Sequence, residues 1–392
     1  MGKGDKNDGD LGCKKYGVPL YGAAWVPAAA VKEDSAAVSE NPVSYNGSRH
    51  VIVAGGGGEG HSGIPNALLL LAFDIESTSL SAEPVGTLRT GSNLPYRIAV
   101  HPGGEGLICS FPKSCRWFEW DSTTSADKHT LSLKSSKKLL EQLDDVGLQL
   151  AMAFNMDGSL FAVGGEDGRL RVLKWPAMES TLDEANVHAS VKDLDFSPDG
   201  NYLVSVGSGP ARIWNVATST SIASLSKQND EIFGFCRFSR TTDRDQVLYI
   251  TAMRDKSSSI IKWNTSSWER INSTRVARDP ISAFNMSPNG KLLAIGTIRG
   301  DILILSSVDM RVQSVVRKAH IGLVTALAFS LDSRALVSAS LDSSARVTLI
   351  KDKKKDGNEP VDHSVHHSTS DSRILREKQR FSFSETVIVQ PT

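Results

Sequence analysis

The chain has 392 residues, of which 40% are hydrophobic and 22% are charged, as is typical of a globular protein. Lys plus Arg and Asp plus Glu balance at 44 each, so net charge gives no reason to expect nucleic acid or an anionic membrane as a partner. The four cysteines have no CxxC spacing, which argues against a zinc site or a disulfide framework. The first dozen residues are too polar for a secretory signal, and the longest apolar run, 67–73, is far shorter than the roughly 20 residues of a membrane helix.

The N-terminal third of the sequence predicts strands that flank one unusual loop. Residues 1–15 are polar and are expected to be disordered. Residues 18–27 (VPLYGAAWVP) have the character of a strand, and two more apolar stretches flank a run of glycines within 51–74 (VIVAGGGGEGHSGIPNALLLLAFD). Further strands follow within 96–121, and 134–148 carries the one pattern that suggests an amphipathic helix.

From residue 150 onward one unit recurs: an apolar strand, a turn of the type Phe-Ser-x-Asp-Gly, a second strand opening on small residues, a polar turn and a third strand. The copies lie at 150–175, 191–215, 231–264, 281–305 and 324–350. Asp-Gly and Asn-Gly favour tight turns because these residues tolerate positive φ, so each unit indicates a β-meander. The turn glycines Gly158 and Gly200 are 42 residues apart, which is the spacing of WD40-type propeller blades.

With the two earlier groups of strands the count is seven, so we predict an all-β, seven-bladed β-propeller over residues 16–350. A propeller must close its ring, because an open sheet edge is an aggregation hazard. We expect the segment 18–27 to complete the outer edge of the last blade. The tryptophans that end the third strands are expected to pack between blades, and Asp195 is expected to stabilise a blade rather than to catalyse a reaction.

The glycine run Gly55–Gly58 stands where the other blades have a short turn, although glycines inside a sheet cost up to about 1 kcal/mol each. A nucleotide-binding loop is disfavoured: Gly55, Gly57 and Gly60 match GxGxxG, but no helix or βαβ unit follows. A P-loop fails as well, because no Gly-Lys-Ser/Thr closes the run. Two alternatives remain, a flexible surface loop and a shaped loop whose backbone groups meet a protein partner or a cation.

Four stretches of the sequence resemble a known family: 20–27 (LYGAAWVP), 55–66 (GGGGEGHSGIPN), 91–106 (GSNLPYRIAVHPGGEG) and 148–172. The family is that of the WD-repeat guanine-nucleotide exchange factors (prolactin regulatory element-binding protein-like) for the small GTPase that starts COPII coat assembly. The residues in these stretches resemble those of a plant member. The resemblance extends over about 16–350. The paralogous phosphate transporter traffic facilitators resemble the fold but lack the glycine run, so its presence favours the exchange-factor branch.

The resemblance implies a GTPase regulator rather than an enzyme with a bond-making active site. Exchange requires only that the nucleotide-free GTPase be bound more tightly than the GDP-bound form. Non-catalytic alternatives are a WD-repeat scaffold that assists the exit of membrane transporters from the endoplasmic reticulum, and a propeller platform that binds peptides. Nothing in the sequence calls for a cofactor other than the potassium ion that the resemblance implies for the loop.

The resemblance also assigns roles within the loop. Gly55, Gly56, Gly57 and Gly58 shape it, Gly63 permits its return, Ile64 offers an apolar contact, and Asn66 supplies a side-chain amide. Gly57, Gly58 and Asn66 are the expected potassium ligands. We expect alanine at both Gly56 and Gly57 to abolish exchange while leaving the melting temperature nearly unchanged.

After Ile350 the composition becomes polar and charged, so we expect residues 351–392 to be a disordered tail. Its three histidines, His363, His366 and His367, could chelate a metal, but a solvated tail is the favoured interpretation. The resemblance implies a membrane helix at this place and a location at the cytosolic face of the endoplasmic reticulum. The sequence given carries no such helix, so the expectation for this C-terminus is a soluble, cytoplasmic protein.

Overall fold

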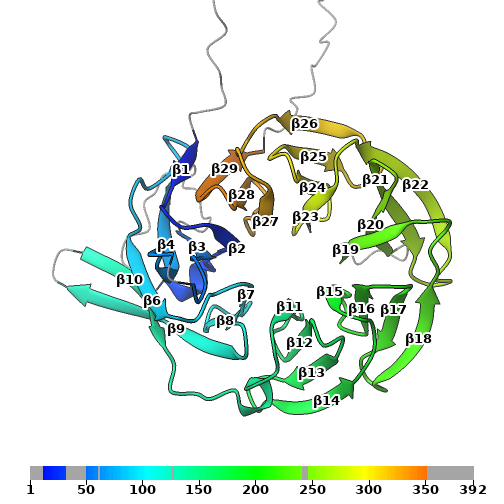
Figure 1. Ribbon diagram of the computed structural model, residues 1–392, viewed down its shortest axis with the longest axis horizontal. Coiled ribbons are helices and arrows are strands. Elements are labelled where there is room, and N and C mark those ends of the chain that lie inside the picture. Colours follow the sequence, from blue (N-terminus) through cyan, green and yellow to red (C-terminus); the bar gives the residue numbers. More distant parts are fainter. Residues whose placement is uncertain (1–11, 32–49, 61, 126–127, 241–245, 351–392) are drawn as a thin grey trace, which may run out of the picture. The chain divides into compact units, whose positions relative to one another are not determined.

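The computed structural model describes residues 12–31, 50–60, 62–125, 128–240 and 246–350. Within these ranges the secondary structure is almost entirely β, with 29 strands and two short 3-10 helices, η1 (Ala28–Ala30) and η2 (Glu141–Leu143). The strands form seven antiparallel sheets arranged as blades around a common axis (Figure 1). The predicted all-β, seven-bladed β-propeller is confirmed.

The blades take their strands in chain order, counted from the axis outward. Blade 1 contains β2 (Leu20–Trp25), β3 (His50–Gly55), β4 (Asn66–Asp74), β5 (Ser79–Leu80) and β6 (Gly86–Gly91), the last two both pairing with β4. Blade 2 contains β7 (Ile98–Val100), β8 (Gly106–Ser110), β9 (Cys115–Ser125) and β10 (Lys128–Ser135). Blade 3 contains β11 (Gln149–Phe154), β12 (Leu160–Gly165), β13 (Leu170–Lys174) and β14 (Glu179–Glu184). Blade 4 contains β15 (Val191–Phe196), β16 (Tyr202–Gly207), β17 (Ala211–Asn215) and β18 (Thr220–Leu225).

The remaining blades follow the same plan. Blade 5 contains β19 (Ile232–Phe238), β20 (Val247–Arg254), β21 (Ser257–Asn264) and β22 (Arg270–Ala277). Blade 6 contains β23 (Ile281–Met286), β24 (Leu292–Thr297), β25 (Ile302–Ser306) and β26 (Val312–Val316). Blade 7 contains β27 (Val324–Phe329), β28 (Ala335–Ser340), β29 (Ser344–Leu349) and β1 (Cys13–Lys15).

The core lies between neighbouring blades. All residues of β24 and β28, the second strands of blades 6 and 7, are buried, because blades pack against both of their faces. Continuous burial therefore replaces the alternation of a half-buried strand, and the serines of β28 are buried with its apolar residues. Trp214 packs in one cluster with Leu182 of blade 3, and Trp263 packs in one cluster with Ile213 of blade 4. The predicted packing of these tryptophans between blades is confirmed.

Asp195 joins blades 4 and 5. Its carboxylate accepts hydrogen bonds from the Phe238 backbone N–H at 2.8 Å and from Nη2 of Arg240 at 2.8 Å. Asp193, two residues earlier, does the same with the Cys236 N–H at 2.8 Å and Nη1 of Arg237 at 2.6 Å. A buried carboxylate is stable only when it is paired and hydrogen-bonded, and Asp195 meets both conditions. Its predicted role in stabilising a blade is confirmed.

Ring closure differs from the prediction. The outer strand of blade 7 is β1, which pairs antiparallel with β29 so that Cys13 lies opposite Arg346 and Lys15 opposite Ser344. The segment 18–27 instead contains β2, the innermost strand of blade 1, which pairs with β3. Its small residues suit a strand that lines the crowded axis. Cys13–Lys15, assigned by the sequence to a disordered terminus, thus belong to the propeller, which begins before the predicted residue 16.

The predicted helix over 134–148 is not formed. Lys134 and Ser135 end β10, where they pair with Glu119 and Phe118, and only the single turn η2 follows. Sheet pairing thus takes up the first two residues of the predicted helix. The predicted tail 351–392, with its three histidines, lies outside the described residues. Within the part of the chain that the structure describes, no helix is long and apolar enough to cross a membrane.

Candidate functional site

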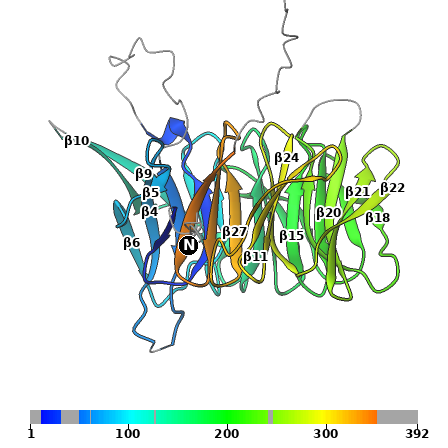
Figure 2. The ribbon, with the colours of Figure 1, turned by 90° about the horizontal axis from the view of Figure 1, so that it is seen from above.

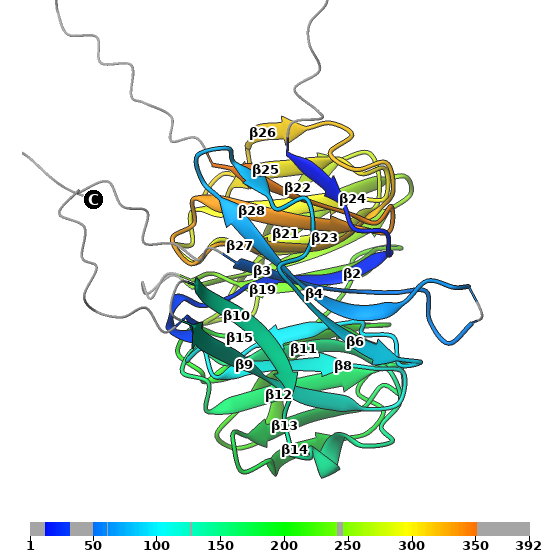
Figure 3. The ribbon, with the colours of Figure 1, turned by 90° about the vertical axis from the view of Figure 1, so that its left-hand side faces the viewer.

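The glycine loop leaves the end of β3 and returns at the start of β4. Figures 2 and 3 show it projecting beyond the end of the propeller, farther than the other strand connections at that end. Because Gly55 pairs with Leu20, the first residue of β2, the loop emerges at the end of the ring where the innermost strands begin.

The root of the loop needs glycine for steric reasons. Gly55 is buried, and a Cβ at this position would lie 2.4 Å from the carbonyl oxygen of Pro19. The N–H of Gly56 donates to that same oxygen at 3.0 Å. A Cβ on Gly56 would lie 2.1 Å from Oδ1 of Asn66, a separation that real Cβ atoms do not reach. The two glycines let the chain pass between the Pro19 carbonyl, just before β2, and the Asn66 side chain.

Asn66 holds the loop from inside. Its side chain is 3% exposed, and its Oδ1 accepts a hydrogen bond from the Gly58 N–H at 2.9 Å. Its Nδ2 donates to the Gly58 carbonyl at 3.0 Å and to the Gly91 carbonyl at 3.0 Å. The amide therefore satisfies both polar backbone groups of Gly58 and ties the loop to the end of β6.

The tip of the loop is formed by glycines in a backbone conformation that other residues rarely adopt. Gly58 has φ +83° and Gly63 has φ +72°, and a Cβ on either would meet no atom within 4 Å. The outgoing and returning arms of the loop approach each other closely beside these glycines. A Cβ on Gly57 would lie 2.3 Å from Oγ of Ser62 and 2.8 Å from Cβ of Ile64. Ile64 itself is 37% exposed and offers an apolar side chain at the surface of the loop.

The structure thus brings together the residues that the sequence singled out in this loop. The Asn66 side chain, however, forms hydrogen bonds within the loop itself. The structure also contradicts the expected tolerance of alanine at Gly56 and Gly57: both added Cβ atoms would overlap with neighbouring atoms. Such a variant would disturb the fold of the loop, so it cannot separate binding from stability. A Cβ on Gly60 would meet no atom within 4 Å, and Gly60 has no positive φ. Gly60 is therefore the better position at which to test binding without disturbing stability.

The expected potassium ligands are neutral oxygens, the kind that hard cations prefer. The carbonyls of Gly57 and Gly58 and Oδ1 of Asn66 are of this kind. In this structure the Asn66 amide bonds both backbone groups of Gly58. Among the described residues no group of three or more His, Cys, Asp or Glu side chains could hold a metal. The potassium ion stays a prediction.

A second segment, Gly91 to Arg97, adjoins the loop; it lies in the stretch 91–106 that resembles the family, but no site residue was predicted in it. It begins at the carbonyl that Asn66 binds and ends at an arginine that bridges the propeller axis. Nε of Arg97 donates to the Leu150 carbonyl of blade 3, and its Nη1 donates to the carbonyls of Tyr21 in blade 1 and Thr325 in blade 7, all at 3.2 Å. No local pattern signals such a contact, because its partners come from three distant parts of the chain.

The buried histidines serve the fold. His320 is 2% exposed and bonds Oγ of Ser344 at 2.6 Å and Oγ of Ser338 at 2.7 Å. Burial lowers its pKa to about 4, which keeps the ring neutral. Burial also lowers the pKa of His188, whose ring bonds Oγ of Ser205 at 3.1 Å. Both rings are engaged in hydrogen bonds that stabilise the blades.

Comparison with known proteins assigns the class. The family described as "WD domain, G-beta repeat" matches residues 144–173, 180–215 and 311–348, which fall in blades 3, 4, 6 and 7. Together with the seven sheets, this match defines a WD-repeat β-propeller.

Curated relatives cover most of the propeller. SEC12-like protein 2 of Arabidopsis thaliana is 49% identical over 346 residues, which are 86% of this chain and 88% of that protein. SEC12-like protein 1 of the same plant is 32% identical over 289 residues, 72% of this chain and 71% of that protein. The chain belongs to the SEC12-like family. A more distant relative, 22% identical over 363 residues (78% of this chain, 86% of that protein), is the guanine nucleotide-exchange factor SEC12 of Mus musculus.

Proposed function

We propose that this protein is a guanine-nucleotide exchange factor that promotes GDP release from the small GTPase that initiates COPII vesicle formation, at the cytosolic face of the endoplasmic reticulum. Two things support the proposal: membership of the SEC12-like family, in which relatives are named guanine nucleotide-exchange factors, and the projecting glycine loop. The observation that carries it is the combination of a root that is fixed by the Asn66–Gly58 hydrogen bonds with a tip, 58–63, that has glycine at three of its six positions.

Exchange is a problem of differential binding. A regulator accelerates GDP release when it stabilises the nucleotide-free GTPase more than the GDP-bound form. A loop whose root is already fixed loses less conformational entropy on insertion, and the Asn66 amide fixes Gly58 at the root of this one. The tip glycines allow the backbone to approach a partner closely, and Ile64 adds an exposed apolar side chain. No bond-making group is required for this process.

A potassium ion bound in the loop would supply a positive charge near the site where the GTPase loses its nucleotide. Gly57, Gly58 and Asn66 would hold it through their oxygens. The contribution of this chain is to present those oxygens on an ordered loop, since Asn66 fixes the position of Gly58.

The test is the rate of GDP release from the purified COPII GTPase loaded with a fluorescent GDP analogue, with the full chain added. The proposal expects faster release in proportion to the protein added, and a larger effect in potassium chloride than in sodium chloride. Equal acceleration of GDP release in the two salts would refute the role of potassium but leave the exchange function supported. Binding of the GTPase without any acceleration would instead support the alternative function, a non-catalytic scaffold that assists the exit of membrane transporters.

A further inference from the structure

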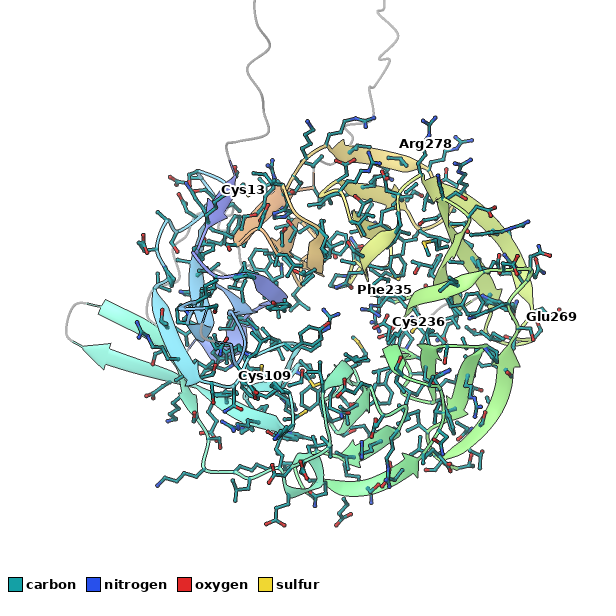
Figure 4. All side chains as sticks on the ribbon, in the orientation of Figure 1. Cys13, Cys109, Phe235, Cys236, Glu269 and Arg278 are labelled. Atoms are coloured by element: carbon teal, nitrogen blue, oxygen red, sulfur yellow. The ribbon has the colours of Figure 1, made fainter. Side chains whose placement is uncertain are left out.

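A hollow of about 330 Å³ lies beside the propeller axis, at the end of the ring from which the glycine loop projects. Its walls come from the starts of the innermost strands of blades 2 to 6 and from the end of β20. The apolar part includes Ile232, Phe235, Met253 and Ile281, and Figure 4 places Phe235 at the inner edge of the ring. The volume is at the lower end of the roughly 300–1,000 Å³ of ligand pockets and suits one or two side chains.

The charged lining of this hollow is entirely basic. Arg97 and Lys192 line it, and no Asp or Glu does. Lys227 is close by, with Nζ 5.6 Å from the ring centroid of Phe233, another lining residue. The adjacent carboxylates of Asp193 and Asp279 are bound to arginines of their own, at 2.6 Å and 2.9 Å. The hollow therefore carries uncompensated positive charge around an apolar floor.

Arg97 retains a free donor for a ligand. Its Nε and Nη1 are occupied by three backbone carbonyls, which are neutral and leave the guanidinium charge unbalanced. Its Nη2 makes no hydrogen bond to any part of the chain that the structure describes. The guanidinium lies 4.7 Å from the ring centroid of Tyr96, which helps to fix its orientation. A guanidinium held in this way is suited to a carboxylate.

We propose that this hollow is a second binding site, for an acidic peptide segment that carries a large apolar side chain. A carboxylate of the peptide bonds Nη2 of Arg97 and pairs with Lys192, while the apolar side chain enters between Ile232 and Met253. Ile232 is 48% exposed, so part of this apolar surface is in contact with water until the peptide covers it. The site is separate from the tip of the glycine loop, and its occupation does not depend on the exchange function.

Three probes with a carboxyfluorescein on the N-terminus test the proposal by fluorescence anisotropy with the full chain: carboxyfluorescein-Glu-Asp-Phe-Asp-Glu-amide, the same peptide with Lys in place of each acid, and the acidic peptide with Ala in place of Phe. The first probe is expected to bind at least about tenfold more tightly than either of the others. Equal affinity for the acidic and basic probes, or no saturable binding of the first probe at about 1 mM protein, would overturn the proposal.

Two variants locate the site. Lys192→Glu and Ile232→Asp are each expected to weaken binding of the first probe about tenfold. Their matched controls, Lys291→Glu at an exposed lysine in a turn of blade 6 and Ile271→Asp at a 53% exposed isoleucine on β22, should leave it unchanged. Because all four changes are at exposed side chains, the variants should remain folded, as circular dichroism can verify. If the controls weaken binding as much as the two site variants, the probe binds elsewhere and the proposal is wrong.

Discussion

The side-chain amide of Asn66 bonds both polar backbone groups of Gly58, accepting from its N–H at 2.9 Å and donating to its carbonyl at 3.0 Å. One buried side chain thereby replaces the backbone pairing that a longer hairpin would have provided. The root of the loop is consequently fixed to blade 1, and its geometry depends on a residue at the first position of β4.

Replacement of Asn66 by alanine should destabilise the protein. The change removes three hydrogen bonds to the backbone of Gly58 and Gly91, and at about 0.5–1.5 kcal/mol for each bond the loss is at least about 1.5 kcal/mol. The free energy of unfolding, measured in urea, should fall by that amount. Asn201→Ala, at an exposed asparagine that bonds Asp199, should change it by less than about 0.5 kcal/mol. Equal losses in the two variants would show that Asn66 does not hold the loop.

Alanine at Gly56 should be destabilising where alanine at Gly60 is not. A Cβ on Gly56 overlaps with Asn66, and overpacking of this kind costs about 1–3 kcal/mol. Gly60 has open space and no positive φ, so its substitution should change the free energy of unfolding by less than about 0.5 kcal/mol. Thermal unfolding of the two variants measures the difference in stability. A Gly56→Ala protein as stable as the unaltered one would mean that Gly56 does not lie against the Asn66 side chain.

Acidification should destabilise the propeller through His320. Its pKa is about 4 in the folded protein, against an ordinary value of 6.5, because burial disfavours the charged ring. Since the folded pKa is the lower one, the stabilisation is complete above about pH 6.5 and is lost as the pH falls toward 4. The loss approaches roughly 3 kcal/mol. Urea unfolding at pH 7 and pH 5 should show the difference, and His320→Asn should reduce it; an unchanged pH dependence in that variant would rule out His320 as its source.

The ion pair of Asp195 with Arg240 should be worth far more than a surface pair. Asp195→Asn leaves the Arg240 charge, whose side chain is 18% exposed, without its partner, and breaking a buried pair costs about 3–5 kcal/mol. Glu179→Gln removes the partner of Lys174 at an exposed position and should cost less than about 1 kcal/mol. Comparable values for the two variants would contradict the role of Asp195 in joining blades 4 and 5.

The blades could be predicted from the sequence because each is a local unit. The turn residues and apolar runs of one blade lie within some 40 residues of each other, so the repeat alone indicates the propeller. Ring closure could not be predicted in the same way. The closing strand β1 has only three residues, Cys13–Lys15, and its partner β29 is at the other end of the propeller sequence. Nothing in three residues of that composition distinguishes a strand from a disordered terminus.

The same limit applies to the loop. Its position and its glycines are visible in the sequence, since a glycine run interrupts a strand pattern. The hydrogen bonds of Asn66 and the contacts of Arg97 are not, because their partners depend on how blade 1 folds and on which blades meet at the axis. The helix prediction over 134–148 was wrong: Lys134 and Ser135 pair with β9, and the weak helical preference of the segment gives only the single turn η2.

The central claim, that the glycine loop drives exchange, is tested most directly by two substitutions of exposed isoleucines in the full chain. Ile64→Asp places a charge on the loop, and Ile222→Asp places one on β18, where the isoleucine is 44% exposed. With the GTPase loaded with a fluorescent GDP analogue, Ile64→Asp should reduce the acceleration of GDP release at least about tenfold, equivalent to about 1.4 kcal/mol of lost stabilisation. Ile222→Asp should act like the unaltered protein. Full acceleration by the Ile64→Asp protein would contradict the claim.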